Sequence, residues 1–252
     1  RGCVVTDARG EDYLDLYGGH AVALTGHCHP TVVAAIREHA GELLFYSSAV
    51  YSRIRAEANE ALLRHAPHEG SRVFHCVSGS EANEVAVKIA RLGTGRPGVV
   101  SFHGSFHGRT LGSLACTANE YFRSAAGVAL DNVIRLPFET APGGGVEQLG
   151  EFACALQDPS SGLEPPAAFL VEAIQAEGGV HVASAAWLQA VQQLARDLGA
   201  LFIIDDIQAG CGRTGSYFSF DGMGLDPDII TLAKGIGGFG TPLAMNLAKP
   251  EH

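Results

Sequence analysis

Two apolar, strand-like runs in the second half of this 252-residue sequence lead to polar residues: one run is followed by a lysine, and the other ends in a carboxylate. Lys234 follows Ile229-Ile-Thr-Leu-Ala233 and opens a glycine-rich turn, and Asp205 ends the run Leu201-Phe-Ile-Ile-Asp205. A lysine so placed is a candidate Schiff-base nucleophile, and a nearby carboxylate can keep a pyridine nitrogen protonated. The pair therefore suits pyridoxal phosphate, the alternative being a surface lysine that follows a core strand.

The composition permits such a site and limits its partners. With 46% hydrophobic and 17% charged residues, the chain can bury a sizeable core. A formal charge of −10 without any lysine or arginine run argues against nucleic acid and against an anionic membrane, so a small-molecule partner is expected. No apolar stretch reaches the ~18 residues that span a bilayer. Six cysteines without a CxxC pair indicate reduced thiols and a cytoplasmic protein, and the isolated pair His27 and His29 predicts no metal site.

Short apolar runs alternate with amphipathic stretches, which is typical of an α/β fold with a mostly parallel sheet flanked by helices. We expect an N-terminal segment over residues 1–46 and one large cofactor-binding domain over residues 47–252. Ligands of such sheets bind beyond the C-terminal strand ends, where each motif below falls. The predicted strands are 72–77, 98–102, 132–136, 167–174, 200–207 and 228–232, and the predicted helices are 30–44, 53–65, 81–91, 146–156 and 185–198.

The turn Ser78-Gly79-Ser80 follows the first of these strands and precedes a helix predicted from Glu81. Unpaired backbone amides at the positive end of a helix dipole can hold a phosphate, so Gly79 and Ser80 are candidate phosphate-binding residues. The alternative is that Ser80 simply caps the helix, with Asn83 in the first turn.

The loop after the second strand brings a phenyl ring, an imidazole and a guanidinium together in Phe106-His107-Gly108-Arg109. Phe106 can stack on a flat ring, and Arg109 can clamp a substrate carboxylate through two parallel hydrogen bonds. A solvated loop with one structural aromatic residue is the alternative.

Two later strand ends also carry polar residues. Glu172 and Glu177 are spaced so that they do not simply share one strand face, and we expect different roles for them, although an acidic capping loop is an equal alternative. Gln208 and Arg213 belong to a glycine-rich turn that lets the backbone fold tightly beside the Asp205 strand end. Arg213 equally fits a structural role.

Together these motifs resemble the class III aminotransferases, which are pyridoxal-phosphate enzymes of fold type I. The motifs occur in the family's order and cover nearly the whole chain. The family's C-terminal part has no counterpart before His252, so the resemblance implies a fragment of a longer protein. The matching segments are GHCHP at 26–30, SGSEANE at 78–84, SFHGRT at 105–110, VEAIQAEGG at 171–179, DDIQAGCGRTG at 205–215 and PDIITLAKG at 227–235.

The resemblance implies a role for each candidate that would face pyridoxal 5'-phosphate. Lys234 would carry the cofactor, Asp205 would contact its pyridinium nitrogen, and Gln208 would hydrogen-bond its phenolic oxygen. The chain has Asp206 where the family usually has a glutamate. The further implied cofactor contacts are Gly79 and Ser80 at the phosphate and Phe106 at the ring face.

On the substrate side, the resemblance implies that Arg109 binds a carboxylate, that Glu177 acts as the gatekeeper acid, and that Tyr51 lines the entrance. The implied reaction moves the distal amino group of a diamino acid to 2-oxoglutarate, giving glutamate and a semialdehyde. The donor favoured here is N-acetylornithine, and diaminobutyrate is the alternative. An aminomutase or a decarboxylase with the same cofactor, or a truncated, non-catalytic subunit, would also fit these residues. A homodimer is implied as well.

Overall fold

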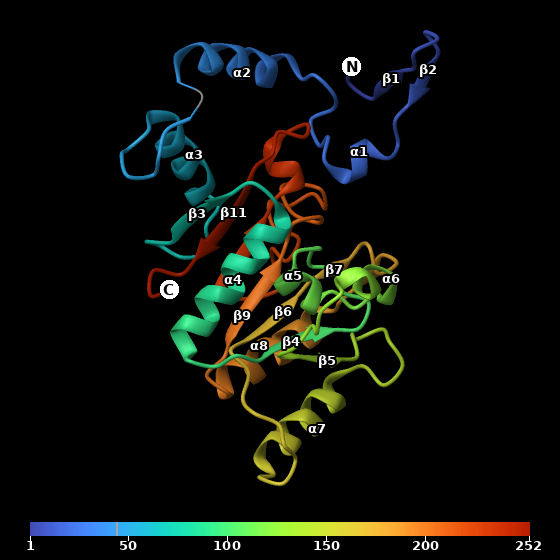
Figure 1. Ribbon diagram of the computed structural model, residues 1–252, viewed down its shortest axis with the longest axis vertical. Helices are drawn as coiled ribbons and strands as arrows, with labels where there is room; N and C mark the ends of the chain where they lie inside the picture. Colours follow the sequence, from blue (N-terminus) through green and yellow to red (C-terminus); the bar gives the residue numbers. More distant parts are fainter. Residues whose placement is uncertain (44) are drawn as a thin grey trace.

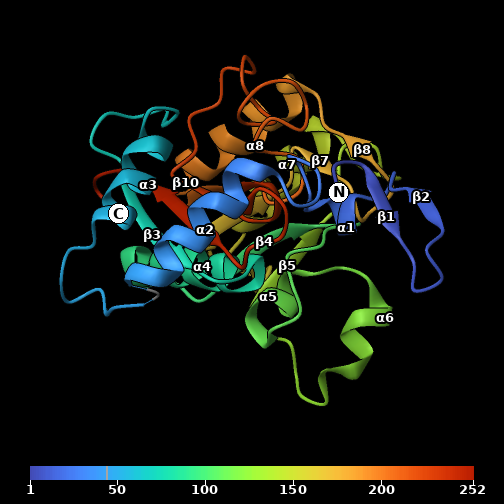
Figure 2. The ribbon, with the colours of Figure 1, turned by 90° about the horizontal axis from the view of Figure 1, so that it is seen from above.

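The computed structural model describes residues 1–43 and 45–252, and its centre is a seven-stranded sheet (Figure 1). The strand order is β3-β11-β10-β9-β6-β4-β5. All neighbours run parallel except β11, which is antiparallel to both β10 and β3. Helices lie on both faces of the sheet, as a second view also shows (Figure 2). The predicted fold class is therefore confirmed.

The main sheet comprises β3 (Arg72–Cys76), β4 (Val99–Phe102), β5 (Val133–Leu136), β6 (Ala168–Val171), β9 (Leu201–Asp205), β10 (Ile229–Leu232) and β11 (Ala244–Ala248). Two small antiparallel pairs are β1 (Val4–Thr6) with β2 (Asp12–Leu14) and β7 (Ile174–Gln175) with β8 (His181–Val182). The helices are α1 (Gly18–Ala21), α2 (Pro30–Glu42), α3 (Arg53–Leu63), α4 (Gly79–Thr94), α5 (Leu111–Cys116), α6 (Glu120–Arg123), α7 (Val146–Gln157) and α8 (Ala185–Asp197). Short 3-10 turns are η1 (Ser124–Ala126) and η2 (Lys234–Gly237).

Every predicted strand and helix overlaps an observed one, but several bounds differ. The single strand predicted at 167–174 is wrong, because β6 stops at Val171 and the carbonyl of Ala173 accepts a hydrogen bond from Ala183 at the end of the β7–β8 pair. The strand predicted at 200–207 ends at Asp205, whose carboxylate turns the chain by accepting the amide hydrogen of Ile207. Strand β11 was not predicted. The last residue of the helix predicted at 30–44 lies outside the described residues.

Helix α4 begins two residues before its predicted start because its first turn is capped from both sides. The Ser78 hydroxyl accepts from the Glu81 amide at 3.2 Å, and the Glu81 carboxylate accepts from the Val77 amide at 2.8 Å. The arrangement is close to a capping box, except that Glu81 bonds the amide of Val77, one residue before the cap. Further along, Ala82 and Ala86 are fully buried, and their small side chains let the helix lie close to β10 and β11.

The opposite face of the sheet is packed by α8 through a cluster of aromatic rings. Trp187 meets Phe102 edge to face at 5.0 Å between ring centroids and Phe138 at 4.9 Å. All three side chains are almost completely buried. Such edge-to-face pairs add about 0.5–1.5 kcal/mol each beyond the burial of their surface. This cluster packs α8 against β4 and against the chain that follows β5.

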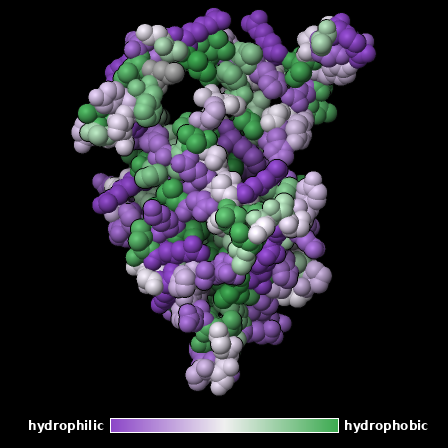
Figure 3. Space-filling view, in the orientation of Figure 1, coloured by the Kyte–Doolittle hydropathy of each residue, from purple (hydrophilic) through white to green (hydrophobic). Residues whose placement is uncertain are grey.

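The N-terminal residues form a separate layer at the C-terminal edge of the sheet. Helix α2 has no buried residue and lies away from the sheet at the top of Figure 1. Apolar side chains are exposed there, among them Leu16 and Tyr17, and green patches are visible in that part of Figure 3. Two hydrogen bonds join this layer to loops at the C-terminal edge of the sheet. The Thr25 amide donates to the Gly238 carbonyl, and the Arg213 guanidinium donates to the Ala21 carbonyl. The division at residue 46 stays a prediction.

The described residues also bear on what a membrane span, a metal site or a reactive cysteine would require. None of the described helices is both long and apolar enough to cross a membrane. Within residues 1–43 and 45–252, no group of three or more His, Cys, Asp or Glu is arranged to hold a metal. The six cysteines are free, and burial raises the pKa of Cys116 and Cys211 to about 12, which makes them unreactive packing residues.

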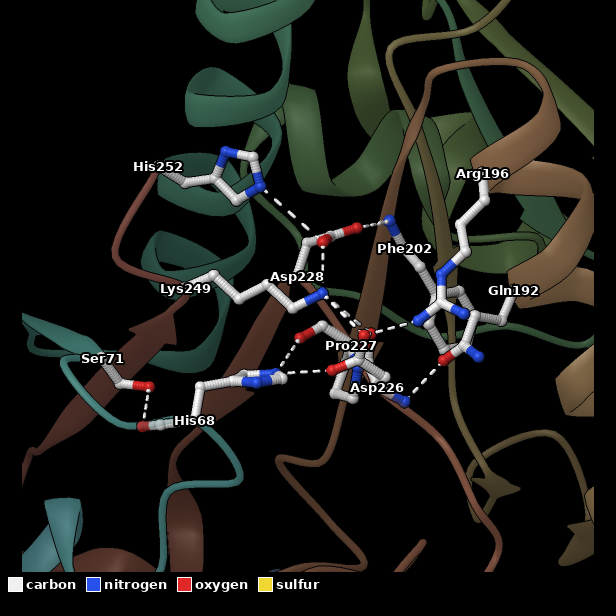
Figure 4. A network of polar contacts seen from close by, with 10 residues as sticks. All are labelled: His68, Ser71, Gln192, Arg196, Phe202, Asp226, Pro227, Asp228, Lys249 and His252. Atoms are coloured by element: carbon white, nitrogen blue, oxygen red, sulfur yellow. Dashed lines mark hydrogen bonds and ion pairs between the residues drawn. The ribbon is translucent and has the colours of Figure 1, made fainter.

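A polar network ties together the end of the sheet opposite to the Asp205 strand end (Figure 4). The Lys249 ammonium, at the end of β11, lies 3.1 Å from Asp226 and 2.9 Å from Asp228, which precedes β10. Asp228 in turn accepts the Phe202 amide of β9 at 2.8 Å, and His68 lies 2.9 Å from Asp226. One cation therefore bridges the starts of two strands and the end of a third.

We predict that Lys249→Met lowers the free energy of unfolding by about 1–3 kcal/mol, because two partly buried carboxylates lose a charged hydrogen-bond donor. Urea unfolding at pH 7 measures the change. Lys88→Met, in α4, is the matched control and is expected to stay within about 0.5 kcal/mol of the unaltered chain. Equal losses in the two variants would show that Lys249 has no bridging role.

Candidate active site

A cavity of about 310 Å³ opens beyond the C-terminal ends of β9 and β10, beside the start of α4. This volume is typical of a small-molecule site, and its place at the strand ends agrees with the position predicted for the motifs. Strands, helix starts and loops that are distant in the sequence converge on it. Its walls are formed by Val22, Val77, Ser78, Gly79, Ser80, Asn83, Phe106, His107, Gly108, Glu172, Asp205, Ile207, Gln208, Ala233, Lys234, Gly240, Thr241, Pro242 and Leu243.

Asp205 ends β9 at the floor of the cavity, and the residue is 6% exposed. One carboxylate oxygen, Oδ2, accepts from the Asn83 amide at 2.7 Å and lies 2.8 Å from the Nδ1 atom of His107. The second oxygen, Oδ1, accepts from the Ile207 backbone amide at 3.1 Å. Hydrogen-bond donors of this kind stabilise an ionised carboxylate in a buried place. The arrangement can hold a protonated ring nitrogen of a ligand.

Lys234 follows the last residues of β10 and projects its amine into the same cavity. Its backbone has a φ of 49°, the left-handed region that lysine seldom adopts, and this conformation starts the turn η2. The Nζ atom donates to the side-chain carbonyl of Gln208. Burial lowers the pKa of Lys234, against the opposing influence of Asp205, Glu177 and Glu172. A larger fraction of the amine is therefore unprotonated and nucleophilic than on a surface lysine.

Glu172 adds a second buried carboxyl group to the cavity wall, with 6% of the residue exposed. Its Oε2 atom accepts from the Phe106 amide at 3.1 Å. Burial, followed by the nearby Asp205 carboxylate, raises the pKa of Glu172 well above its usual value. Burial therefore favours the protonated form of Glu172, which reduces the negative charge that faces Asp205.

The start of α4 forms a cradle for an anion. In the described part of the chain, the backbone amides of Gly79 and Ser80 donate to no protein acceptor, as expected at a helix N-terminus. A Cβ on Gly79 would lie 2.9 Å from the Cδ1 atom of Ile207, so a glycine lets the start of α4 pack closely against that side chain. Gly108, with a φ of 131°, closes the opposite side, where a Cβ would clash with the Ser80 hydroxyl oxygen. The helix cap is Ser78, so the alternative that Ser80 caps α4 is wrong.

Of the residues predicted to contact the cofactor ring or the substrate, some line the cavity and others do not. Phe106 lines the cavity and meets Phe122 edge to face. Arg109 does not line it; its guanidinium lies 4.7 Å from the centroid of the Phe122 ring. Tyr51 is fully exposed, at 105%, in the loop before α3 and outside the cavity. Glu177 stands just outside the cavity.

A line of polar contacts leads from the lysine to the N-terminal layer. Gln208 accepts from Lys234 and donates from Nε2 to Glu177 at 3.3 Å. Glu177 also lies 3.1 Å from the Nε2 atom of His20, which follows the start of α1. Gln208 therefore couples the cavity to Glu177, the residue predicted to face the substrate. Arg213 contributes from the surface by holding the Ala21 carbonyl at 2.6 Å, which agrees with a structural role.

Several cavity residues had no sequence signal of their own. Ile207, Val22 and the segment 240–243 are apolar, glycine, threonine or proline residues whose types indicate no chemistry. Asn83 and His107 belonged to the motifs that were singled out, but no role at Asp205 was predicted for them. Only the spatial convergence of α4, the loop after β4 and β9 reveals that role.

Comparisons with known proteins agree with this fold and this site. The profile of the aminotransferase class-III family matches residues 1–251. The diaminobutyrate–2-oxoglutarate transaminase of Bordetella parapertussis is 41% identical over 256 residues, covering 100% of this chain and 59% of that protein. The Vibrio cholerae protein of the same name is 42% identical over 256 residues, covering 100% and 62%. The crystal structure of taurine:2-oxoglutarate aminotransferase from Bifidobacterium kashiwanohense, in complex with PLP and glutamate, superposes with a TM-score of 0.89 at 28% identity and covers 98% of this chain and 58% of that one.

A mostly parallel sheet with a lysine and a carboxylate at adjacent strand ends defines a fold type I aminotransferase domain. This chain belongs to the class III aminotransferase family. It spans about 60% of the length of the curated relatives that it matches.

Asp206 points to the opposite face from Asp205, as strand alternation predicts, and is completely buried. Both of its oxygens accept hydrogen bonds from Ser219, one from the hydroxyl and one from the backbone amide. Burial raises the pKa of Asp206 to about 7, while the bonds from Ser219 oppose the shift. The folded chain therefore binds a proton at this site more tightly than the unfolded chain.

We predict that this proton makes stability fall as the pH rises from about 4 to 7, by an amount on the order of 4 kcal/mol. Below about pH 4 both states are protonated and the contribution is complete, and above about pH 7 it is lost. Asp206→Asn can still accept from the Ser219 amide and can donate to the Ser219 hydroxyl, and it should flatten the slope, which urea unfolding at several pH values measures. Asp197→Asn, on the exposed end of α8, is the control. An unchanged slope in Asp206→Asn would contradict the assignment.

Proposed function

We propose that this chain binds pyridoxal 5'-phosphate and transfers an amino group from an amino acid to 2-oxoglutarate. The observation that carries the proposal is the convergence of three features in one cavity: the amine of Lys234, the carboxylate of Asp205 and the free amides at the start of α4. Each matches one part of the cofactor, namely its aldehyde, its ring nitrogen and its phosphate. The family membership supports the same cofactor.

The residues present fit pyridoxal phosphate in chemistry as well as in position. The amides of Gly79 and Ser80 would hold the phosphate, and Asp205 would hold the ring nitrogen. Gln208, already bonded to the lysine, would also reach the phenolic oxygen. Phe106 would cover one ring face. When bound, the cofactor supplies an electron sink for the bond that is broken at the amino carbon.

The protonation of two cavity side chains suits this chemistry. Lys234, with its lowered pKa, is both a nucleophile and a base that can move a proton at the substrate carbon. Burial favours the neutral form of Glu172, and Asp205 is the carboxylate that would face the ring nitrogen. The apolar walls formed by Val22 and Ile207 limit access of water to these groups.

For the amino donor, we propose the distal amino group of a diamino acid. Relatives at 40–42% identity over nearly all of this chain are named diaminobutyrate–2-oxoglutarate transaminases, which supports diaminobutyrate ahead of N-acetylornithine. The products would be glutamate and a semialdehyde. We propose that Glu177, linked to Gln208 and His20, faces the donor. Arg109 and Tyr51 are proposed at the substrate carboxylate and the entrance, which requires the guanidinium to leave the Phe122 ring.

We further propose a cytoplasmic homodimer. The free state of all six cysteines supports a reducing compartment. Exposed apolar side chains support coverage by a second copy, namely Leu16 at 90% and Phe45 at 81% in the N-terminal segment and Tyr51 in the loop before α3.

The cofactor assignment predicts which lysine becomes labelled. The chain has three lysines, and borohydride reduction of the cofactor-loaded chain followed by peptide mapping should place the pyridoxyl group on Lys234. Lys234→Ala should retain little label and lose multiple-turnover transamination by orders of magnitude, because the nucleophile and base are removed together. Label on Lys88 or Lys249 in the unaltered chain would contradict the site.

The donor assignment predicts the outcome of a half-reaction assay. With the loaded chain in excess, diaminobutyrate and N-acetylornithine are each added, and conversion of the cofactor to its amine form is followed by absorbance. Faster conversion by diaminobutyrate is expected, with glutamate formed when 2-oxoglutarate follows. Carbon dioxide release without amino transfer would indicate a decarboxylase instead. Cofactor binding without conversion by any donor would indicate a non-catalytic chain.

A further inference from the structure

The Asp205 carboxylate is supported from the side of α4 by a side chain that has no role in the function proposed above. Asn83, in the second turn of the helix, is completely buried and donates from Nδ2 to the Oδ2 atom of Asp205 at 2.7 Å. The same nitrogen donates its second hydrogen to the His107 carbonyl at 2.7 Å. Its carbonyl oxygen accepts from the Thr231 hydroxyl of β10 at 2.9 Å. One side chain thus joins the helix, the loop after β4 and two strands.

The orientation of this amide is fixed by its partners. Rotating it by half a turn would place its oxygen against the Asp205 carboxylate and the His107 carbonyl, both of which are acceptors, and would leave Nδ2 at the Thr231 hydroxyl. Three hydrogen bonds would be lost or weakened inside a buried site, where unpaired polar groups are costly. Asn83 therefore always presents a donor to Asp205.

Asp205 needs such donors because its charge has little further compensation. Among residues 1–43 and 45–252, neither lysine nor arginine forms an ion pair with it, and His107 is its only ion-pair partner. Burial opposes a negative charge at this place, since Asp205 is only 6% exposed. Neutral donors that point at a carboxylate favour its ionised form. Each donor that is lost shifts the balance toward a protonated carboxyl group.

We propose that Asn83 is a positioning residue, whose amide keeps Asp205 ionised so that the proton shared with a bound pyridine ring stays on the ring nitrogen. The proposal rests on the proposed function, because it requires pyridoxal phosphate in the cavity. It adds a residue that does not touch the substrate and acts through Asp205. A purely structural Asn83 would affect stability but would leave the proton on the nitrogen.

The test uses pyridoxal 5'-phosphate labelled with ¹⁵N in the ring, bound to this chain, with the ring ¹⁵N chemical shift as readout. In Asn83→Leu, which is close in size and has no donor, the ratio of protonated to unprotonated nitrogen should fall about tenfold, the effect of one lost bond to a charged group. Thr231→Val removes only the hydroxyl that orients Asn83 and should shift the signal in the same direction by less. Thr231→Val decides the matter if Asn83→Leu does not fold.

Asn246→Leu is the matched control. Asn246 lies on β11 directly opposite Thr231, is completely buried, and both polar atoms of its side chain lack partners in the described part of the chain. This variant removes a buried amide on the same face and should leave the ¹⁵N signal unchanged. An unchanged signal in Asn83→Leu and Thr231→Val, or an equal shift in Asn246→Leu, would overturn the proposal. Failure of the unaltered chain to bind the labelled cofactor would instead contradict the proposed function.

Discussion

The buried carboxylate of Asp205 is the constraint on which the rest of the site depends. An ion in that position is stable only where donors surround it, and three separate parts of the chain supply them. Helix α4 must lie close to the sheet for Asn83 to reach it, which the buried alanines of the helix allow. The loop after β4 must fold back to bring His107 there. The geometry of the cavity follows from satisfying this one charge.

The ionisable groups near Asp205 have shifted pKa values. Burial raises the pKa of Glu172 and of Asp206 and lowers the pKa of Lys234. These shifts share one physical cause, which is removal from water, and they act in the direction that chemistry on a pyridine ring requires. A neutral amine is a nucleophile, and a neutral neighbouring acid does not compete for the same proton. Burial thus shifts these groups toward their neutral forms before any ligand binds.

Much of the sheet was predictable, because buried parallel strands are short apolar runs and amphipathic helices separate them. Lys234, Asp205 and Gln208 were also identifiable, since polar residues that follow apolar runs stand out. Strand β11 was not predicted, because its run contains Asn246 and follows a glycine-rich segment. The role of Asn83 was not predictable from the sequence for a different reason. Its partners Asp205, His107 and Thr231 are distant in the sequence, so only packing brings them together.

The place of β11 between β3 and β10 has a consequence for the order in which the protein folds. Strand β3 joins the sheet only through β11, with Cys76 paired to Ala244, so the two partners are separated by most of the described chain. Closing so long a loop is slow and costs entropy before any contact compensates it. During synthesis, β4, β6, β9 and β10 can pair as they emerge, whereas β3 must wait for residues 244–248. The pairing of β3 therefore belongs among the last steps of folding.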